Sequence, residues 1–258
     1  MSDQADVLLV ERDGPVLVVT MNRPDDLNAF NDDLHHAFSR FWVDVEFDLD
    51  VRAVVLTGAG KAFCAGGSLD DFETFRTDLR ARGSIIRSAR RLVDEMINAR
   101  VPVVAAVNGA AVGLGCTLMT LCDIVFVADS AQVADPHVAV ALVAGDGSAV
   151  AWPQHTSLLK AKQYLLTGDS MSGQEAVSIG IANFAVPAEE VVDRARAYAH
   201  RLAALPPQAV QDTKALLNQQ LRLSATAVLG YGLAAETHSH DTPEYAAVPE
   251  KFKRRKGG

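Results

Sequence analysis

The feature of this sequence that most constrains its fold is a repeated alternation of short β-branched runs with longer amphipathic stretches. Apolar runs at 16–21 and 52–57 each end in a turn signal, and residues 31–46 between them have the spacing of an amphipathic helix. The pattern then repeats, with strands predicted at 103–107 and 124–128 and helices predicted at 84–99 and 113–121. This alternation favours a parallel sheet with helices packed outside it.

The last quarter of the chain has a different pattern. After a short strand at 183–186, the sequence from Pro187 onward is rich in Ala and Leu and predicts helices. Helix breaks are expected at Pro206 and Pro207, at Gly230 to Gly232, and at Pro243. With 258 residues, 49% of them hydrophobic, the chain can bury one large core. We therefore predict a single α/β domain over 1–258, with a core at 1–186 and a C-terminal helical layer at 187–258.

Charge limits the classes of partner. The formal net charge is −8, so the chain has no overall positive field for nucleic acid or anionic lipid, and neither is expected as a partner. The one dense basic run lies at the C-terminal end and is either a solvated tail or an anion site. It comprises Lys251, Lys253, Arg254, Arg255 and Lys256.

Cysteine usage and the N-terminal sequence bear on the compartment. Cys64, Cys116 and Cys122 are odd in number and match no metal-binding spacing, so they are expected to be reduced thiols. The chain shows no basic-then-apolar leader and no apolar run of the ~18 residues that a membrane span needs. We expect a cytoplasmic protein without a bound metal.

Two glycine-rich segments each follow a predicted strand and open a helix. The first, 61–69, contains Gly66 and Gly67, and the second, 106–116, contains Gly113. Such turns expose backbone N–H groups that have no partner within the helix, and glycine lets a ligand approach them closely. Two such turns facing each other would hold one oxygen between two donors, as an oxyanion hole does. Each turn alone is equally well explained as a tight turn under close helix packing.

In this order and separation, the two segments resemble the paired signature of the crotonase superfamily, the enoyl-CoA hydratases and isomerases. The resemblance covers nearly the whole chain and includes Asn22-Arg23-Pro24, Asn28-Ala29, Cys122-Asp123-Ile124, residues 166–169 and Glu250-Lys251-Phe252. It implies the crotonase fold, a spiral of repeated ββα units followed by the helical layer. It also implies an acyl-CoA substrate, no cofactor beyond the coenzyme A of that substrate, and a homotrimer that often pairs into a hexamer.

The resemblance further implies the residues of the site. The oxyanion donors would be the backbone N–H groups of Gly67 and Leu114. Contacts to coenzyme A would come from the first half of the chain and from its end, with the last two closing over the nucleotide: Arg23, Ala29, Ala65, Ser68, Leu69, Phe252 and Lys253. Ser68 stands where many relatives carry an aspartate.

The catalytic pattern departs from the family. Hydratases of this family use two glutamates, and the matching positions here are Thr117 and His137. A threonine hydroxyl is too weak an acid to serve as a base near neutral pH, although it can hold a water. Histidine can move a proton at pH ~7 when a carboxylate fixes its tautomer, and Asp146 in the turn at 142–147 is the candidate partner.

The His137 and Asp146 pair resembles the β-diketone hydrolase branch that includes 6-oxocamphor hydrolase. That branch also places a histidine near the second glycine turn, where this chain has Leu114. Purely structural roles could also explain both residues. An aspartate between two glycines is a common turn residue, and a histidine after Pro136 can be a half-buried structural side chain.

Other ionisable residues are interpreted more simply. Three acids follow the first glycine turn, Asp70, Asp71 and Glu73. They either face the acyl end of the pocket or, as we prefer, interact favourably with the dipole at a helix N-terminus. A second group, Glu236, His238 and His240, lies on a late helix of the kind that lines the pocket in relatives. Its preferred interpretation is a solvated helix face, and it has no metal-binding spacing.

Three functions follow from these observations. The first is an acyl-CoA-binding hydratase or isomerase in which His137 and Asp146 replace the glutamates. The second is a hydrolase that cleaves the C–C bond of a β-diketone or β-keto thioester. The third is a family member that binds coenzyme A without catalysis.

Overall fold

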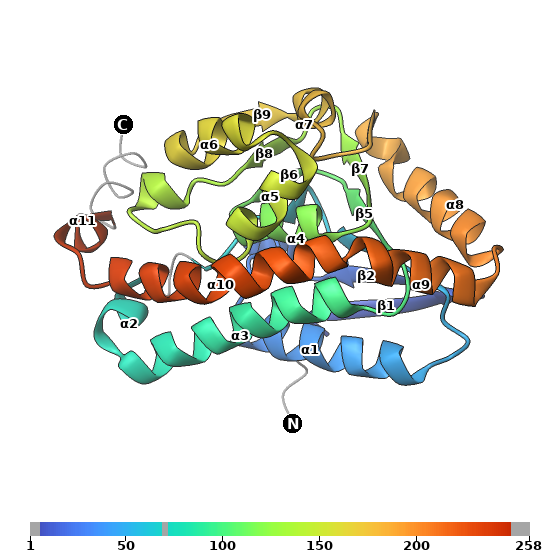
Figure 1. Ribbon diagram of the computed structural model, residues 1–258, viewed down its shortest axis with the longest axis horizontal. Helices are drawn as coiled ribbons and strands as arrows, with labels where there is room; N and C mark the ends of the chain where they lie inside the picture. Colours follow the sequence, from blue (N-terminus) through green and yellow to red (C-terminus); the bar gives the residue numbers. More distant parts are fainter. Residues whose placement is uncertain (1–5, 69–71, 249–258) are drawn as a thin grey trace.

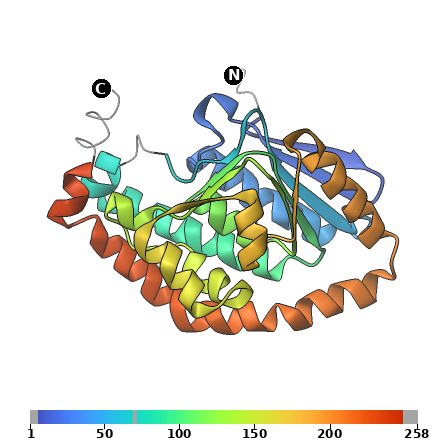
Figure 2. The ribbon, with the colours of Figure 1, turned by 90° about the horizontal axis from the view of Figure 1, so that it is seen from above.

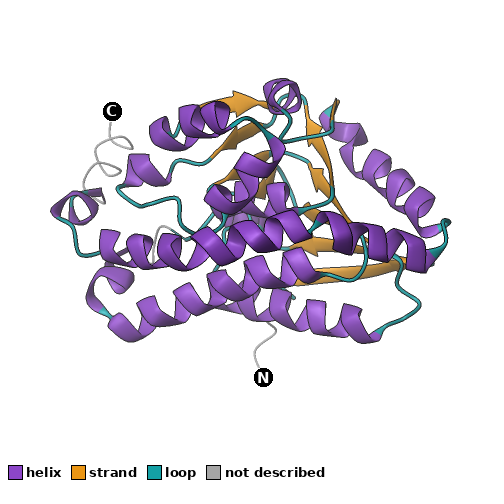
Figure 3. Ribbon diagram, in the orientation of Figure 1, coloured by secondary structure: helices purple, strands orange, loops and turns teal. Residues whose placement is uncertain are grey.

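The computed structural model describes residues 6–68 and 72–248, and Figure 1 shows their arrangement. In this part of the chain the strands form a six-stranded and a four-stranded sheet (Figure 3). The larger sheet has the order β1 (Leu8–Asp13), β2 (Val16–Met21), β3 (Ala53–Gly58), β5 (Val103–Val107), β7 (Ile124–Ala128) and β10 (Phe184–Val186). Only the β1–β2 pair of this described sheet is antiparallel, as expected for a hairpin, and the other pairs are parallel.

The smaller sheet explains the repeat. Its order is β4 (Ala62–Cys64), β6 (Ala110–Val112), β8 (Gln132–Ala134) and β9 (Ser170–Ser172). The strands β3, β5 and β7 of the larger sheet are each followed in sequence by β4, β6 and β8 of the smaller one. This is a repeated ββα core, and it confirms the predicted fold class.

The helices cover the sheets and extend beyond them. Within the described ranges they are α1 (Asp32–Phe47), α2 (Phe72–Thr77), α3 (Leu79–Asn98), α4 (Leu114–Leu121), α5 (Ser148–His155), α6 (Leu158–Thr167), α7 (Gly173–Ile179), α8 (Val191–Ala203), α9 (Pro207–Leu217), α10 (Gln219–Ser239) and α11 (Pro243–Ala246). Short 3-10 turns occur at Pro24–Asp26, His137–Val140 and Ala188–Glu190. Helix α8 packs on β3, β5 and β7 (Figure 2), whereas α3 lies between α1 and α10 (Figure 1).

Local sequence accounts for the helix boundaries. Asn31 caps α1 by accepting a hydrogen bond from the N–H of Leu34 at 3.0 Å, and buried Phe38 and Trp42 follow at helical spacing. The helix predicted at 84–99 begins earlier, at Leu79, because Asp78 caps it through the N–H groups of Arg80 and Ala81.

The predicted break at Gly230 to Gly232 is wrong. Helix α10 runs unbroken from Gln219 to Ser239. A Cβ on Gly232 would lie 3.0 Å from the carbonyl oxygen of Gly145, and a Cβ on Gly145 would lie 2.3 Å from that of Gly232. The two glycines therefore serve close packing of α10 against the loop before α5 rather than a helix break. The breaks at Pro207 and Pro243 are confirmed, since each opens a new helix.

Candidate active site

The two glycine turns meet in the structure. Gly66 has a φ of +94°, and a Cβ there would lie 2.8 Å from the carbonyl oxygen of Val112 and 3.6 Å from the nitrogen of Leu114. A Cβ on Gly115 would lie 2.2 Å from the carbonyl oxygen of Cys64. Only glycine permits this contact between the β4 and β6 turns. The turns predicted from sequence as separate signals are thus one junction.

Each turn presents an N–H group without a protein acceptor. Phe30 bridges to the first turn through the carbonyl of Gly66 and the N–H of Ser68, which leaves the N–H of Gly67 unused. Leu114 is the first residue of α4, so its N–H has no acceptor inside the helix. Among the described residues, neither N–H donates a hydrogen bond to another group.

Both turns open onto a cavity of about 430 Å³. Six of the residues predicted for the site line this cavity: Ala65, Gly67, Ser68, Leu114, His137 and Asp146. Much of the remaining surface is apolar, with contributions from Phe30, Phe72, Phe75, Ile85, Ile86 and Leu142. A mostly apolar cavity with a few polar groups at one place is typical of a small-molecule site.

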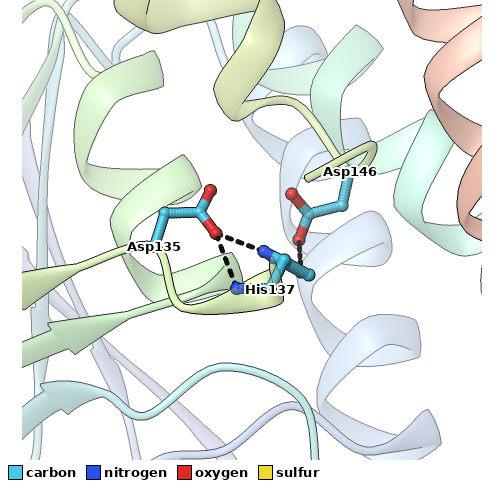
Figure 4. Close-up of side chains that lie close together, drawn as sticks. All are labelled: Asp135, His137 and Asp146. Carbon is cyan, nitrogen blue, oxygen red and sulfur yellow. Dashed lines mark hydrogen bonds and ion pairs between the residues drawn. The ribbon is translucent and has the colours of Figure 1, made fainter. Parts of the chain in front are cut away.

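His137 lies between two carboxylates (Figure 4). It follows β8 and opens a 3-10 turn, and its Nδ1 hydrogen-bonds Oδ1 of Asp135, which also accepts from the backbone N–H of His137 at 3.3 Å. On the other side of the ring, Nε2 lies 3.5 Å from Oδ2 of Asp146. Asp146 was predicted as a partner of His137 from the sequence, whereas Asp135 was missed. Its signal in the sequence is its place two residues before the histidine, in Asp135-Pro136-His137.

The two carboxylates determine the charge of the ring. Burial alone would lower the pKa of His137, but the charges of Asp135 and Asp146 and their hydrogen bonds outweigh burial and hold that pKa well above its ordinary value. Burial would raise the pKa of Asp135, yet the charge of His137 and its hydrogen bonds hold it below the ordinary value. At neutral pH the ring is therefore an imidazolium ion, with a proton to give rather than a lone pair to receive one.

Thr117 positions the second carboxylate. Its hydroxyl is fully buried and donates to Oδ1 of Asp146 at 3.0 Å, and it lies 2.9 Å from the hydroxyl of Ser148. Gly147, with a φ of +134°, lets the chain turn directly after Asp146 and start α5 at Ser148. The carboxylate of Asp146 therefore lies next to Thr117, at the position where the family's hydratases carry a glutamate.

Asp135, His137 and Asp146 each offer an atom within 4.8 Å of the others, the spacing of a possible metal site. The two carboxylates, however, bind opposite nitrogens of the ring. One metal ion would bind only one of these nitrogens, whereas the protonated ring carries an N–H on each nitrogen and so satisfies both contacts. The geometry therefore fits an imidazolium between two acids better than a shared metal.

Glu236 was expected to be a solvated side chain, and this prediction is wrong. The side chain lines the cavity, and its Oε2 is buried without a hydrogen-bond partner. A Cβ on Gly145 would lie 3.0 Å from that oxygen, so the close contact of α10 with the 145 loop brings Glu236 beside the residue before Asp146. The two other residues of this predicted group differ in position: His240 also lines the cavity, whereas His238 is exposed to solvent.

The residues predicted to contact coenzyme A divide into three groups. Ala65 and Ser68 lie on the cavity. Arg23 and Ala29 are not among the residues that line it, and the guanidinium of Arg23 pairs with Asp26 and donates to the carbonyl of Ala29. Leu69, Phe252 and Lys253 lie outside the described residues. Glu73 pairs with Arg76 on the surface, whereas Asp70 and Asp71 are also outside.

Thiol chemistry has no support at this site. Cys64, Cys116 and Cys122 are free and buried, and burial raises the pKa of each, to about 12 for Cys64. The thiolate, which is the nucleophilic form, is therefore disfavoured. Across the described residues, no helix has the length and apolar character required to cross a membrane.

The ββα core and the two opposed glycine turns define the class of protein: it has the crotonase fold. The chain belongs to the enoyl-CoA hydratase/isomerase family, whose model matches residues 11–252, and it is an enzyme of that family. A short-chain-enoyl-CoA hydratase of Clostridium acetobutylicum is 32% identical over 227 residues, which cover 87% of this chain and 85% of that protein.

Solved structures agree with this assignment. An enoyl-CoA hydratase/isomerase from Mycobacterium paratuberculosis is similar with a TM-score of 0.92 and 45% identity, covering 97% of this chain and 100% of that one. A β-diketone hydrolase from the cyanobacterium Anabaena, bound to (S)-3-oxocyclohexyl acetic acid, has a TM-score of 0.84 and 27% identity, with coverage of 92% and 94%.

Proposed function

We propose that this enzyme adds water to, or moves the double bond of, an enoyl-CoA, with coenzyme A present only as part of the substrate. The observation that carries the proposal is that the His137 cluster and the two free N–H groups open onto one cavity. The thioester oxygen would bind between the N–H groups of Gly67 and Leu114. Donors that are already in place stabilise the charge that develops on this oxygen as an enolate forms.

The structure suggests a division of acid and base roles. In hydration, Asp146 takes a proton from water while the water oxygen bonds to the β-carbon, and the electron pair of the double bond moves onto the thioester oxygen. The imidazolium of His137 then protonates the α-carbon. The proton taken up by Asp146 returns to Nε2 of His137, 3.5 Å away, and restores both groups. In isomerisation the same pair removes and returns protons without a net addition of water.

This scheme differs from a simple exchange of histidine for glutamate. His137 acts as the acid, because two carboxylates keep it protonated, and Asp146 acts as the base. Thr117 holds Asp146 by its hydroxyl and takes no proton itself. The general acid–base contribution of such a pair is typically ~10²–10⁴-fold in rate.

Arg23, Ala29, Ala65, Ser68, Leu69, Phe252 and Lys253 would contact the coenzyme A portion. The family resemblance supports this role for all of them, and the position of Ala65 and Ser68 on the cavity adds geometric support for two. Assembly as a homotrimer or a hexamer and a cytoplasmic location stay predictions from that resemblance.

Hydrolysis of a C–C bond is the second candidate. It is favoured by the similarity to the Anabaena β-diketone hydrolase and by a His/Asp pair that lines the same cavity as Gly67 and Leu114. In that reaction activated water would attack a ketone carbon, and the C–C bond would break to leave an enolate in the oxyanion hole. Coenzyme A would then be dispensable.

Turnover of crotonyl-CoA and longer enoyl-CoA substrates, measured beside a CoA-free cyclic β-diketone, separates these functions. We expect hydration or isomerisation of an enoyl-CoA by the wild type and a loss of about 10³-fold in His137→Ala. His238→Ala is the matched control, since His238 is exposed on α10 away from the cavity, and its activity should match the wild type.

Each outcome has a definite meaning. Cleavage of the diketone with no enoyl-CoA turnover would replace the proposed function by C–C hydrolysis. Binding of acyl-CoA without turnover of any substrate would indicate a non-catalytic family member. Full activity of His137→Ala would refute the role assigned to the histidine.

A further inference from the structure

Glu236 is a polar group that the proposed chemistry does not use. Helix α10 approaches the catalytic loop closely through Gly232 and Gly145, and one turn later this contact places the carboxyl of Glu236 on the cavity. Its Oε2 is buried and has no hydrogen-bond partner in the described part of the chain. A buried polar group without a partner costs free energy, so such groups in binding sites often await a ligand.

The surroundings of Glu236 favour its neutral form. Burial and then the charge of Asp146 are the main causes that raise the pKa of Glu236, to about 8. The positive charge of His137 lowers this pKa by less, and the charge of Asp135 raises it slightly further. At neutral pH the side chain is therefore a carboxylic acid, which has an O–H to donate. Among the described residues, Asp146, His137 and Asp135 are the charged groups that act on it.

A second unpartnered polar atom lies on the same cavity. His35 on α1 is 5% exposed, and its Nε2 has no hydrogen-bond partner. Burial lowers the pKa of His35 to about 4, so the ring is neutral. Phe30 packs against the ring at a centroid distance of 4.9 Å. Two different helices thus bring a neutral polar atom to a cavity that is otherwise largely apolar.

We propose that the acyl group bound here carries a neutral oxygen, a keto or hydroxyl group beyond the β-carbon, which accepts a hydrogen bond from Glu236. This inference rests on the proposed function. An unsubstituted hydrocarbon chain would leave both polar atoms unpaired. A carboxylate on the chain would meet Asp135 and Asp146, whose charges exceed the single positive charge of His137, so an anionic acyl group is disfavoured.

Binding of unreactive ligands tests the inference separately from catalysis. The probes are a saturated acyl-CoA and its keto and hydroxy derivatives of the same length, with the oxygen moved along the chain beyond the β-carbon, so that none is a product of hydration or a β-keto thioester. The readout is Kd by calorimetry. For the wild type we expect at least one oxygenated ligand to bind about tenfold more tightly than the hydrocarbon. Glu236→Leu should abolish this ratio, whereas Glu236→Gln, which still donates, should retain most of it.

Glu95→Gln is the matched control. Glu95 on α3 also has a pKa raised chiefly by burial, but it does not line this cavity, and its substitution should leave the ratio unchanged. A wild type that binds the hydrocarbon as well as every oxygenated ligand would overturn the inference. So would a Glu236→Leu protein, folded by its melting temperature, that keeps the wild-type ratio.

Failure of the proposed function would give a different result. If His137→Ala keeps the oxygen preference but loses turnover, the catalytic and the selective groups are separate, as inferred. If no acyl-CoA binds, the proposed function fails, and the same ratio is measured with a cyclic diketone and its hydrocarbon counterpart. If the diketone binds more tightly than its hydrocarbon counterpart and Glu236→Leu removes this preference, the inference about Glu236 stands although the proposed function fails. Equal binding of the diketone and the hydrocarbon would overturn the inference together with the proposed function.

Discussion

The cavity has two sides that are built in different ways. One side, the glycine wall, consists of Gly66, Gly67, Gly113 and Leu114, and it offers backbone N–H groups held by the contact of two turns. The other, the acid wall, consists of His137, Asp146 and Glu236, and it offers side chains from a loop and from α10. The glycine wall matches the family pattern, whereas the acid wall departs from it.

The difference shows how a fold can keep one half of its chemistry while changing the other. Backbone N–H groups do not titrate, and folding alone holds them in place, so any sequence that forms the two turns presents them. Side-chain acids depend on individual residues and on their neighbours' charges. Substitution at positions such as Thr117 and His137 can therefore change the side-chain chemistry without moving the backbone N–H groups of the two turns.

After His137→Ala, the largest effect is expected from disturbing the glycine wall. Gly66→Ala places a Cβ 2.8 Å from the carbonyl oxygen of Val112, at a φ of +94°, and should push the two turns apart. Loss of one oxyanion donor costs about 10²-fold in kcat. Gly67→Ala is the control, because a Cβ there meets nothing within 4 Å and the N–H is kept, so kcat should change much less. Equal losses in the two variants would contradict the junction described here.

A smaller effect is expected at the support of the acid wall. Thr117→Val removes the hydroxyl that donates to Asp146 at 3.0 Å and should lower kcat by about tenfold, the equivalent of one hydrogen bond. Thr120→Val on the same helix removes a hydroxyl that bonds only carbonyls of α4. Its thermal stability should change while its kcat stays that of the wild type. A Thr117→Val enzyme of full activity would show that Asp146 needs no support.

The smallest effect concerns stability and pH. The pKa of Glu236 is about 8 in the folded chain against an ordinary 4.5, so the folded chain keeps a proton that the unfolded chain releases between these values. The free energy of unfolding therefore falls as pH rises through this window. His137, with a raised pKa, adds stability below its ordinary 6.5 that is lost at higher pH. Asp135 and Asp146 face both groups.

Glu236→Gln should remove the pH dependence of stability that comes from Glu236 and leave the pH dependence that comes from His137. Melting temperatures of the two proteins are compared from pH ~5 to ~8, and the variant should lose about 7 °C less than the wild type across that range. Parallel pH profiles would mean that Glu236 is ionised throughout and donates no hydrogen bond.

Sequence patterns predicted the long elements well and the short ones poorly. Strands such as β2 and β5 were found because they are continuous buried runs, whereas β4, β6, β8 and β9 have three residues each, too few for a period to be visible. Asp135 was missed because its role depends on a ring that turns back toward it. Gly232 was taken for a break because its packing partner, Gly145, lies far away in sequence.

By itself the sequence determined the alternation of strands and helices, the two glycine turns and the residues at the positions of the family's glutamates. These follow from local spacing and from the chemistry of single residues. The tertiary structure alone decided that both turns form one junction, that His137 is protonated between two acids, and that Glu236 is neutral on the cavity. Charge states and close contacts depend on burial and on neighbours distant in the chain, and folding alone brings these together.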